Sequence, residues 1–124
     1  MSFLVLRAYW KLIYFDFYLA RGNFAALYEK VRSCPLGPAS ELPDLAKRTC
    51  AAVDIACIWY WKEVRCLQRS AVTTSLLRHC GVPAQMVIGA LEIPFTAHAW
   101  TEVGGRAIHE RRDVQKIYAV VERC

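Results

Sequence analysis

The feature that most constrains this chain is a change of pattern near residue 81. The segment from Cys66 to about Cys80 reads as a helix, and Gly81 and Pro83 follow it directly. Glycine readily adopts the left-handed conformation that ends a helix, and a proline shortly afterwards blocks its continuation. From Ala84 onward, β-rich runs separated by turn residues replace the helical pattern. The chain therefore has to join a helix to a sheet at this point.

The rest of the chain divides on either side of that junction. Helices are expected at residues 3–20, 24–32 and from Pro43 to about Trp59, with a linker at Pro35, Gly37 and Pro38. Strands are expected at residues 84–93, 97–103, 106–110 and 117–122. Helices come first and an antiparallel meander second, which is typical of the α+β class.

Length and composition indicate one folded domain. The chain has 124 residues, of which 56% are hydrophobic and 22% charged, so disorder is excluded. We divide the domain into a helical N-terminal part, residues 1–62, and a core at residues 63–124. The net charge of +5 comes from scattered basic residues rather than from a run that would follow a phosphate backbone, so no nucleic-acid partner is expected.

The N-terminal segment indicates the compartment. Arg7, Lys11 and Asp16 interrupt what would otherwise be an apolar export signal or membrane-spanning helix. We therefore expect a cytoplasmic protein with no transmembrane segment, in which the six cysteines are reduced and most act as small buried hydrophobes. The same segment is an amphipathic helix with a wide apolar face. That face either packs into the protein's own core or stays partly exposed for a partner protein or a membrane.

Cys66 stands apart from the other cysteines, because it opens a helix. Unpaired backbone N–H groups and the helix dipole favour a thiolate at such a position. Arg65 and Arg69 flank it, and Arg69 lies on nearly the same helical face. The first-turn N–H groups also point to where an oxyanion would form. Cys66 is therefore the predicted nucleophile, and a thiol of this kind needs no cofactor or metal.

His98 is the predicted base, and Glu110 the predicted acid that orients it. A two-residue Gly104-Gly105 turn would place Glu110 on the opposite side of the sheet from His98. A three-residue turn, 103–105, shifts the register by one, and we predict this second arrangement. The pairs it predicts are Glu102 with Arg106, Trp100 with Ile108, and His98 with Glu110.

Several motifs occur in a specific order. They are Cys-Leu-x-Arg-Ser at residues 66–70, Gly-Val-Pro-Ala at 81–84, and Pro-Phe-x-Ala-His-Ala-Trp-x-Glu-x-x-Gly at 94–105. In this order they resemble the transglutaminase-like leader peptidases of lasso-peptide biosynthesis, the microcin-processing family. The resemblance is carried by residues 59–123, and the preceding helices also look like the N-terminal part of that family.

The resemblance implies a papain-like cysteine protease that removes the leader from a ribosomally synthesised precursor peptide. The family's cysteine maps onto Cys66 and its histidine onto His98. Its aspartate falls at Glu110, a departure from the family pattern, and Asp113 lies nearby as a substitute. A longer Glu side chain can still accept a hydrogen bond from an imidazole N–H.

The resemblance also implies partners. These are the precursor peptide, a small leader-binding protein and a macrolactam synthetase that uses the freed peptide. The predicted substrate-binding residues are Trp59, Trp61, Arg69 and Trp100. Two other functions stay open, namely a non-catalytic peptide-binding module and an acyl transferase on the same core. A metal-binding protein is disfavoured, because His79-Cys80 and the other Cys and His positions lack finger-like spacing.

Overall fold

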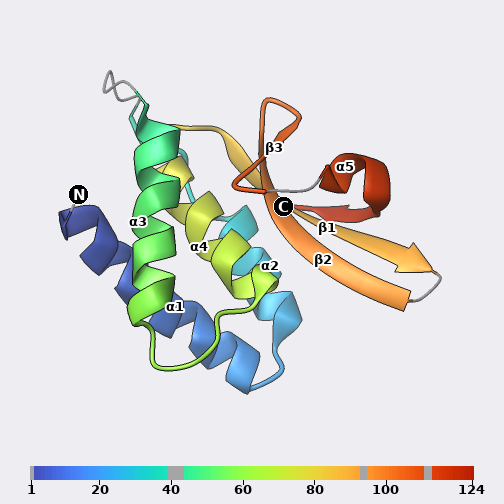
Figure 1. Ribbon diagram of the computed structural model, residues 1–124, viewed down its shortest axis with the longest axis horizontal. Helices are drawn as coiled ribbons and strands as arrows, with labels where there is room; N and C mark the ends of the chain where they lie inside the picture. Colours follow the sequence, from blue (N-terminus) through green and yellow to red (C-terminus); the bar gives the residue numbers. More distant parts are fainter. Residues whose placement is uncertain (1, 39–43, 93–94, 111–112) are drawn as a thin grey trace.

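The computed structural model describes residues 2–38, 44–92, 95–110 and 113–124. In these ranges, helices precede an antiparallel sheet, which confirms the α+β prediction (Figure 1). The helices are α1 (Ser2–Ala20), α2 (Phe24–Arg32), α3 (Leu45–Trp59), α4 (Cys66–His79) and the short α5 (Val114–Ile117). The strands are β1 (Ala84–Glu92), β2 (Phe95–Val103), β3 (Arg106–Ile108) and β4 (Ala119–Arg123). The expected helix start at Pro43 and strand end at Ile93 lie outside the described residues.

The sheet differs from the expected meander in its last strand. Its order is β3-β2-β1-β4, so β4 pairs with β1 at the far edge instead of continuing beside β3. The one-turn helix α5 stands between β3 and β4 and carries the chain across. The strand expected at residues 117–122 is therefore present in part, as Ala119–Arg123, and it closes the opposite edge of the sheet.

Helix α4 is the centre of the molecule. It packs against α1 and α3 on one side and against β1 and β2 on the other (Figure 1). All side chains from Ser70 to Leu77 are buried, so the helix shows little separation of polar and apolar faces. At its N-terminal end, the buried Gln68 amide donates a hydrogen bond to the Leu12 carbonyl, at 2.8 Å. The position of Cys66 is thereby tied to α1 as well as to the sheet.

The expected end of α4 is confirmed in detail. Gly81 has a φ of +91°, in the left-handed region. Its N–H donates to the Arg78 carbonyl at 3.0 Å, and the Val82 N–H donates to the Leu77 carbonyl at 2.9 Å. These two bonds satisfy carbonyls that the helix would otherwise leave unpaired, in the arrangement of a Schellman cap. The chain leaves the helix here and enters β1.

The predicted register of the second hairpin is wrong. Val103 pairs with Arg106, and Thr101 pairs with Ile108, so the loop has two residues, Gly104 and Gly105. Both glycines have positive φ, +61° and +78°. A two-residue turn with positive φ at both positions matches the twist of the adjoining strands, and two successive glycines adopt it without steric cost. The predicted pairs of Glu102 with Arg106 and Trp100 with Ile108 are absent for this reason.

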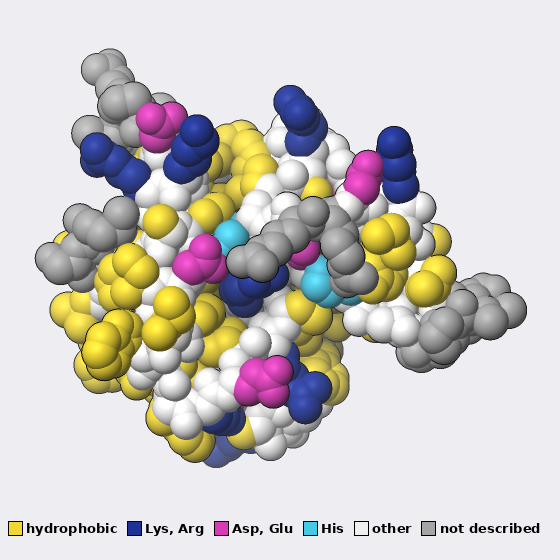
Figure 2. Space-filling model, in the orientation of Figure 1, with side chains coloured by type: hydrophobic (Ala, Val, Ile, Leu, Met, Phe, Trp, Pro, Cys, Tyr) yellow, Lys and Arg dark blue, Asp and Glu magenta, His cyan; other side chains and the backbone are white. Residues whose placement is uncertain are grey.

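The apolar face of helix α1 is partly packed into the protein's own core and partly exposed, the two arrangements considered for it above. Ala8, Leu12 and Phe15 are buried in the helical core. Other large apolar side chains of the same helix remain exposed, and Figure 2 shows hydrophobic side chains gathered on the α1 and α3 side of the molecule. In the described ranges, no helix combines the length and apolarity needed to cross a bilayer.

Candidate active site

Cys66 is the first residue of α4, and the chain enters it through Arg65 in an extended conformation. The first backbone N–H groups of a helix have no acceptor within the helix, so they point outward around this thiol. A cavity of about 500 Å³ adjoins the same end of α4. Its lining includes Lys62, Glu63, Arg65 and Gln68. The cavity thus reaches residues on both sides of Cys66, although Cys66 itself is not among the described residues that line it.

The environment of Cys66 contrasts with that of several other cysteines, all six of which are free thiols. Burial raises the pKa of both Cys50 and Cys57 to about 11, and it also raises the pKa of Cys124. A thiol with so high a pKa is almost entirely protonated at neutral pH and attacks poorly. These three residues are therefore poor nucleophiles. Cys124 is buried, as expected of a small hydrophobe, whereas the other five cysteines are only partly buried.

His98 lies in β2, and its imidazole contacts the Glu110 carboxylate. The distance from His98 Nε2 to Glu110 Oε1 is 2.8 Å, and both side chains are largely buried, with exposed fractions of 15% and 9%. Bonding through Nε2 assigns the proton of the neutral ring to that nitrogen and leaves Nδ1 as an acceptor. The histidine–carboxylate contact expected from the sequence is thus present, although the strand register expected to produce it is not.

The backbone at His109 explains how the contact forms in the other register. Strand β3 ends at Ile108, and His109 adopts a φ of +62°, which is uncommon for a residue with a side chain. The strand alternation is broken at this residue, so Glu110 is not held on the face that the two-residue turn would give it. His109 Nε2 contacts Asp54 Oδ1 of α3 at 2.6 Å. This second histidine–carboxylate pair anchors the left-handed residue.

Two aromatic rings support the His98 imidazole. Its centroid is 5.5 Å from that of Tyr118 and 6.1 Å from that of Trp100, with interplanar angles of 28° and 27°. Gly89, opposite His98 on β1, leaves space for this packing. A Cβ there would lie 2.6 Å from the Trp100 ring and 2.7 Å from Tyr118. The missing side chain therefore permits the aromatic layer beneath His98.

Trp100 is fixed from its other end by a buried carboxylate. Its indole N–H donates to Glu102 Oε2 at 2.9 Å, and the Gln115 amide donates to the same oxygen at 3.1 Å. Only 1% of Trp100 is exposed, so the structure gives its ring no surface for substrate, and its expected role in substrate binding stays a prediction. Its large ring and donor suit a supporting position in the smaller core. Glu102 serves this purpose instead of pairing with Arg106.

The helix carrying Cys66 and the strand carrying His98 are joined by polar contacts. Thr101 Oγ1 lies 3.3 Å from the Ser70 carbonyl and 3.1 Å from Thr74 Oγ1. Side chains alternate along a strand, so His98 leaves β2 on the face opposite to Thr101. Strand β3 pairs with residues 101–103 of β2. The Thr101 bonds hold the middle of α4 against β2, and the His98 side chain lies with Trp100 and Tyr118 on the other face of the sheet.

Arg69 connects the two parts of the site. It follows Cys66 by three residues, and its Nη2 lies 3.9 Å from the Glu110 oxygen that contacts His98. In Figure 2, basic, acidic and histidine side chains gather between the helical part and the sheet. Among the described residues, Cys66 Sγ has no hydrogen-bond partner. The structure thus links α4 to the His98–Glu110 pair through Arg69, and it shows no direct bond between the Cys66 thiol and the His98 imidazole.

The remaining predicted site residues lie elsewhere. Trp59 and Trp61 are 75% and 71% exposed, and Trp61 lies under Lys62, which pairs with Asp16 of α1. Asp113 contacts Lys116 at 3.6 Å, and the carboxylate recorded at His98 is that of Glu110.

Sequence reasoning missed three supporting residues, namely Gly89, Tyr118 and Asp54. Gly89 breaks an otherwise β-rich run, and a glycine inside a strand is a recognised sign of close approach. Nothing comparable in the sequence marks Tyr118 or Asp54.

The arrangement has the parts that nucleophilic chemistry needs. It contains a thiol at a helix N-terminus, an imidazole with one nitrogen held by a carboxylate, and backbone donors beside the thiol. Within the described ranges, no group of three or more His, Cys, Asp or Glu side chains is placed to hold a metal ion.

Comparison with protein families agrees with this organisation. A family model described as the transglutaminase-like superfamily matches residues 11–123, nearly the whole chain. Comparison with curated proteins and with solved structures gives no significant match.

Proposed function

Because this chain belongs to the transglutaminase-like superfamily, which includes cysteine peptidases, we propose that it is a peptidase that removes a leader peptide from a ribosomally synthesised lasso-peptide precursor. The observation that carries the peptidase proposal is the 2.8 Å contact between His98 Nε2 and Glu110 Oε1, beside the helix that begins at Cys66. The motifs at residues 66–70, 81–84 and 94–105 support leader removal, because together they resemble that peptidase family.

The proposed mechanism begins with a thiolate at Cys66 and an imidazolium at His98. Glu110 accepts from Nε2 and so directs Nδ1 toward the thiol. The thiolate attacks the scissile carbonyl, and the first-turn N–H groups of α4 stabilise the oxyanion. His98 then protonates the departing amine, which leaves an acyl-enzyme on Cys66. Water, deprotonated by the now neutral His98, attacks this thioester, releases the peptide's new carboxyl end and restores the Cys66 thiolate and the His98 imidazolium.

This mechanism requires the thiol and the imidazole to approach each other when substrate binds. Catalytic hydrogen bonds are often absent or long before substrate is present, and they shorten in the complex. The cavity of about 500 Å³ beside Arg65 and Gln68 is the proposed entrance for the peptide. Arg69, whose guanidinium is 3.9 Å from Glu110, is proposed to help hold that carboxylate in place.

The proposed partners are a precursor peptide and a small leader-binding protein, with a macrolactam synthetase that uses the freed peptide. The proposed compartment is the cytoplasm, where precursors are made and thiols stay reduced. Trp59 and Trp61 remain candidates for peptide contact, since both are well exposed.

The test is incubation with a leader-bearing precursor peptide and its leader-binding protein, followed by mass spectrometry. We expect hydrolysis at one bond by the wild type and no cleavage by Cys66→Ala. Cys80→Ala, just after the other end of the same helix, is the matched control and should cleave normally. Transfer of the peptide to an added amine would indicate an acyl transferase, and binding without reaction would indicate a non-catalytic module. Cleavage by Cys66→Ala at the wild-type rate would exclude the proposal.

Alkylation provides a second test that needs no substrate. At neutral pH, iodoacetamide should modify Cys66 fastest, because a helix N-terminus favours the thiolate. Cys50 and Cys57 should react very slowly, because burial raises the pKa of each thiol to about 11. Peptide mapping after a short exposure measures both. Faster labelling at Cys50 or Cys57 than at Cys66 would contradict the proposed nucleophile.

A further inference from the structure

Helix α1 carries a second apolar face, which the protein's own core does not use. It consists of Phe3, Leu6, Trp10, Ile13 and Phe17, here called the α1 stripe. Their exposed fractions are 68%, 57%, 63%, 39% and 55%. The buried side chains of α1 are others, namely Ala8, Leu12 and Phe15. An exposed apolar surface of this length on a small protein is typical of an interaction site.

The spacing of the α1 stripe is typical of a surface that packs against another helix. Successive members are separated by three, four, three and four residues, which is the repeat of a seam between two packed helices. Such a seam buries its large side chains against a facing helix. We propose that the α1 stripe binds an amphipathic, acidic helix of a partner protein. This inference does not depend on the proposed peptidase activity.

The charges beside the stripe indicate that the partner is acidic. Arg7 lies over the Phe3 ring at 5.7 Å, Lys11 over Tyr14 at 6.0 Å, and Arg21 over Phe17 at 4.2 Å. None of these three cations forms an ion pair with a described residue.

The one acid within α1, Asp16, is already neutralised. It accepts from Lys62 and Tyr60, each at 2.7 Å. A partner helix with Glu or Asp beside its apolar seam would therefore meet only uncompensated positive charge, which favours association and its correct alignment.

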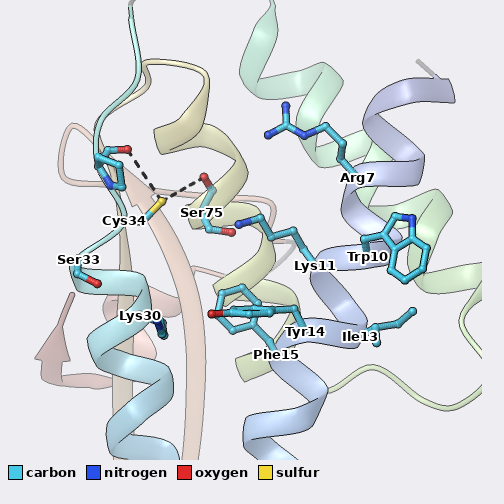
Figure 3. Close-up of a pocket in the computed structure, with 11 residues that line it drawn as sticks. Arg7, Trp10, Lys11, Ile13, Tyr14, Phe15, Lys30, Ser33, Cys34 and Ser75 are labelled. Carbon is cyan, nitrogen blue, oxygen red and sulfur yellow. Dashed lines mark hydrogen bonds between the residues drawn. The ribbon is translucent and has the colours of Figure 1, made fainter.

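A cavity beside the stripe offers a place for a large side chain. It measures about 720 Å³ and lies between α1 and the segment that follows α2. Figure 3 shows Trp10, Ile13 and Tyr14 on the α1 side of it and Cys34 on the other, with the side chains of Arg7 and Lys11 pointing from α1 toward the Cys34 side. Cavities of this size accommodate groups as large as a small ligand. A bulky side chain from the partner helix can therefore anchor there, as in other helix-in-groove interfaces.

The same charges disfavour a second copy of this chain as the occupant. A second copy would bring the same cations, namely Arg7 and Lys11 of α1 and Arg21 just after its end. Its α1 would offer them no free acid, because Asp16 is the one acidic residue of the helix and is already held by Lys62 and Tyr60.

The test uses two synthetic 21-residue peptides as probes. Both have Leu at the seam positions; one has Glu at the flanking positions, and the other has Lys. Calorimetry at about 150 mM salt, where long-range charge effects are screened, measures binding to the whole protein. We expect the acidic peptide to bind at least tenfold more tightly than the basic one. The double variant Leu6→Gln/Ile13→Gln should reduce that affinity at least tenfold. Val121→Gln, an equally exposed apolar site on β4, should leave it unchanged.

Two further measurements separate the other occupants. Sedimentation velocity shows self-association, and flotation with phosphatidylglycerol vesicles shows lipid binding. Equal affinity for both peptides, or no effect of the double variant, would overturn the proposal. The proposal would also be overturned if the wild-type protein did not bind the acidic peptide but formed a dimer or bound vesicles, and the double variant lost that dimer or vesicle binding. Circular dichroism checks that the double variant is folded, and both substituted side chains point outward in any case.

Discussion

Two histidine–carboxylate pairs lie close together in the chain but in different surroundings. His98 contacts Glu110 at 2.8 Å, and His109 contacts Asp54 at 2.6 Å. The Glu110 side chain is 9% exposed, whereas the Asp54 side chain is 55% exposed. The first pair joins β2 to the segment that follows β3, and the second joins that segment to α3. The two histidine–carboxylate contacts are therefore similar in length but differ in how far water reaches the carboxylate.

The difference in burial gives the two pairs different strengths. Water and salt screen an exposed carboxylate, and exposed ion pairs contribute little to stability, about 0–1 kcal/mol. Around Glu110 there is less water, so its contact with His98 orients the ring more firmly. His98 also stacks on Tyr118 and Trp100, which fixes the plane of the ring. We infer that His98 is held for chemistry and that His109 holds the backbone.

The largest expected effect comes from exchanging the two histidines for alanine, one at a time. His98→Ala should lower kcat/KM for leader cleavage by roughly 10³-fold or more, because it removes the base and the acid together. His109→Ala should have a far smaller effect, since that side chain contacts Asp54 rather than reacting groups. Steady-state kinetics with the precursor peptide measure both. A larger loss in His109→Ala than in His98→Ala would reverse the assignment of the two pairs.

The next effect concerns the carboxylate of the buried pair. Glu110→Ala should lower kcat roughly 10- to 100-fold without abolishing activity, because an orienting carboxylate matters less than the nucleophile or base. Glu110→Asp should retain more activity, because it keeps the acceptor. Asp113→Ala is the control and should be nearly silent, since Asp113 contacts Lys116 at the surface. An unchanged rate in Glu110→Ala would remove this residue from the mechanism.

What the sequence predicts well is local. Cys66 at the start of a helix, the left-handed Gly81 and the α+β order all follow from short-range preferences, and all are present. The prediction of the hairpin register was wrong because a two-residue and a three-residue turn both fit a double glycine. Which of the two forms depends on the twist of the adjoining strands. The His98–Glu110 contact was expected from the wrong register. It forms because His109 has a φ of +62°, a conformation that histidine adopts more often than most residues but still too rarely for the sequence to mark it.

What the sequence does not predict is set by distant residues. The contact of His109 with Asp54 joins residues 55 positions apart, and Tyr118 reaches His98 only because β4 crosses to β1. The burial of Trp100 depends on a glycine across the strand at Gly89. In α1 the apolar pattern was clear, but which apolar residues are buried depends on where α3 and α4 pack.

The smallest effect tests whether the exposed pair acts through the buried one. Asp54→Ala removes the acceptor that holds His109 in its left-handed conformation, so Glu110 should be less well placed. We expect kcat to fall by about 2- to 5-fold, because small displacements of an orienting group lower the rate. The free energy of unfolding should fall by no more than about 1 kcal/mol, since the Asp54 carboxylate is exposed. Asp54→Asn, which keeps an oxygen acceptor, should restore most of the rate.

A double-mutant cycle separates positioning from general destabilisation. If Asp54 acts by placing Glu110, then Asp54→Ala should have no further effect on kcat once Glu110 is alanine, because there is no carboxylate left to place. If instead it loosens α3 and the whole site, the two losses should multiply. The cycle is measured as kcat for the wild type, both single variants and the double variant, at a temperature where all four are folded. Multiplicative losses would leave the His109–Asp54 pair as an anchor of the fold with no special connection to His98.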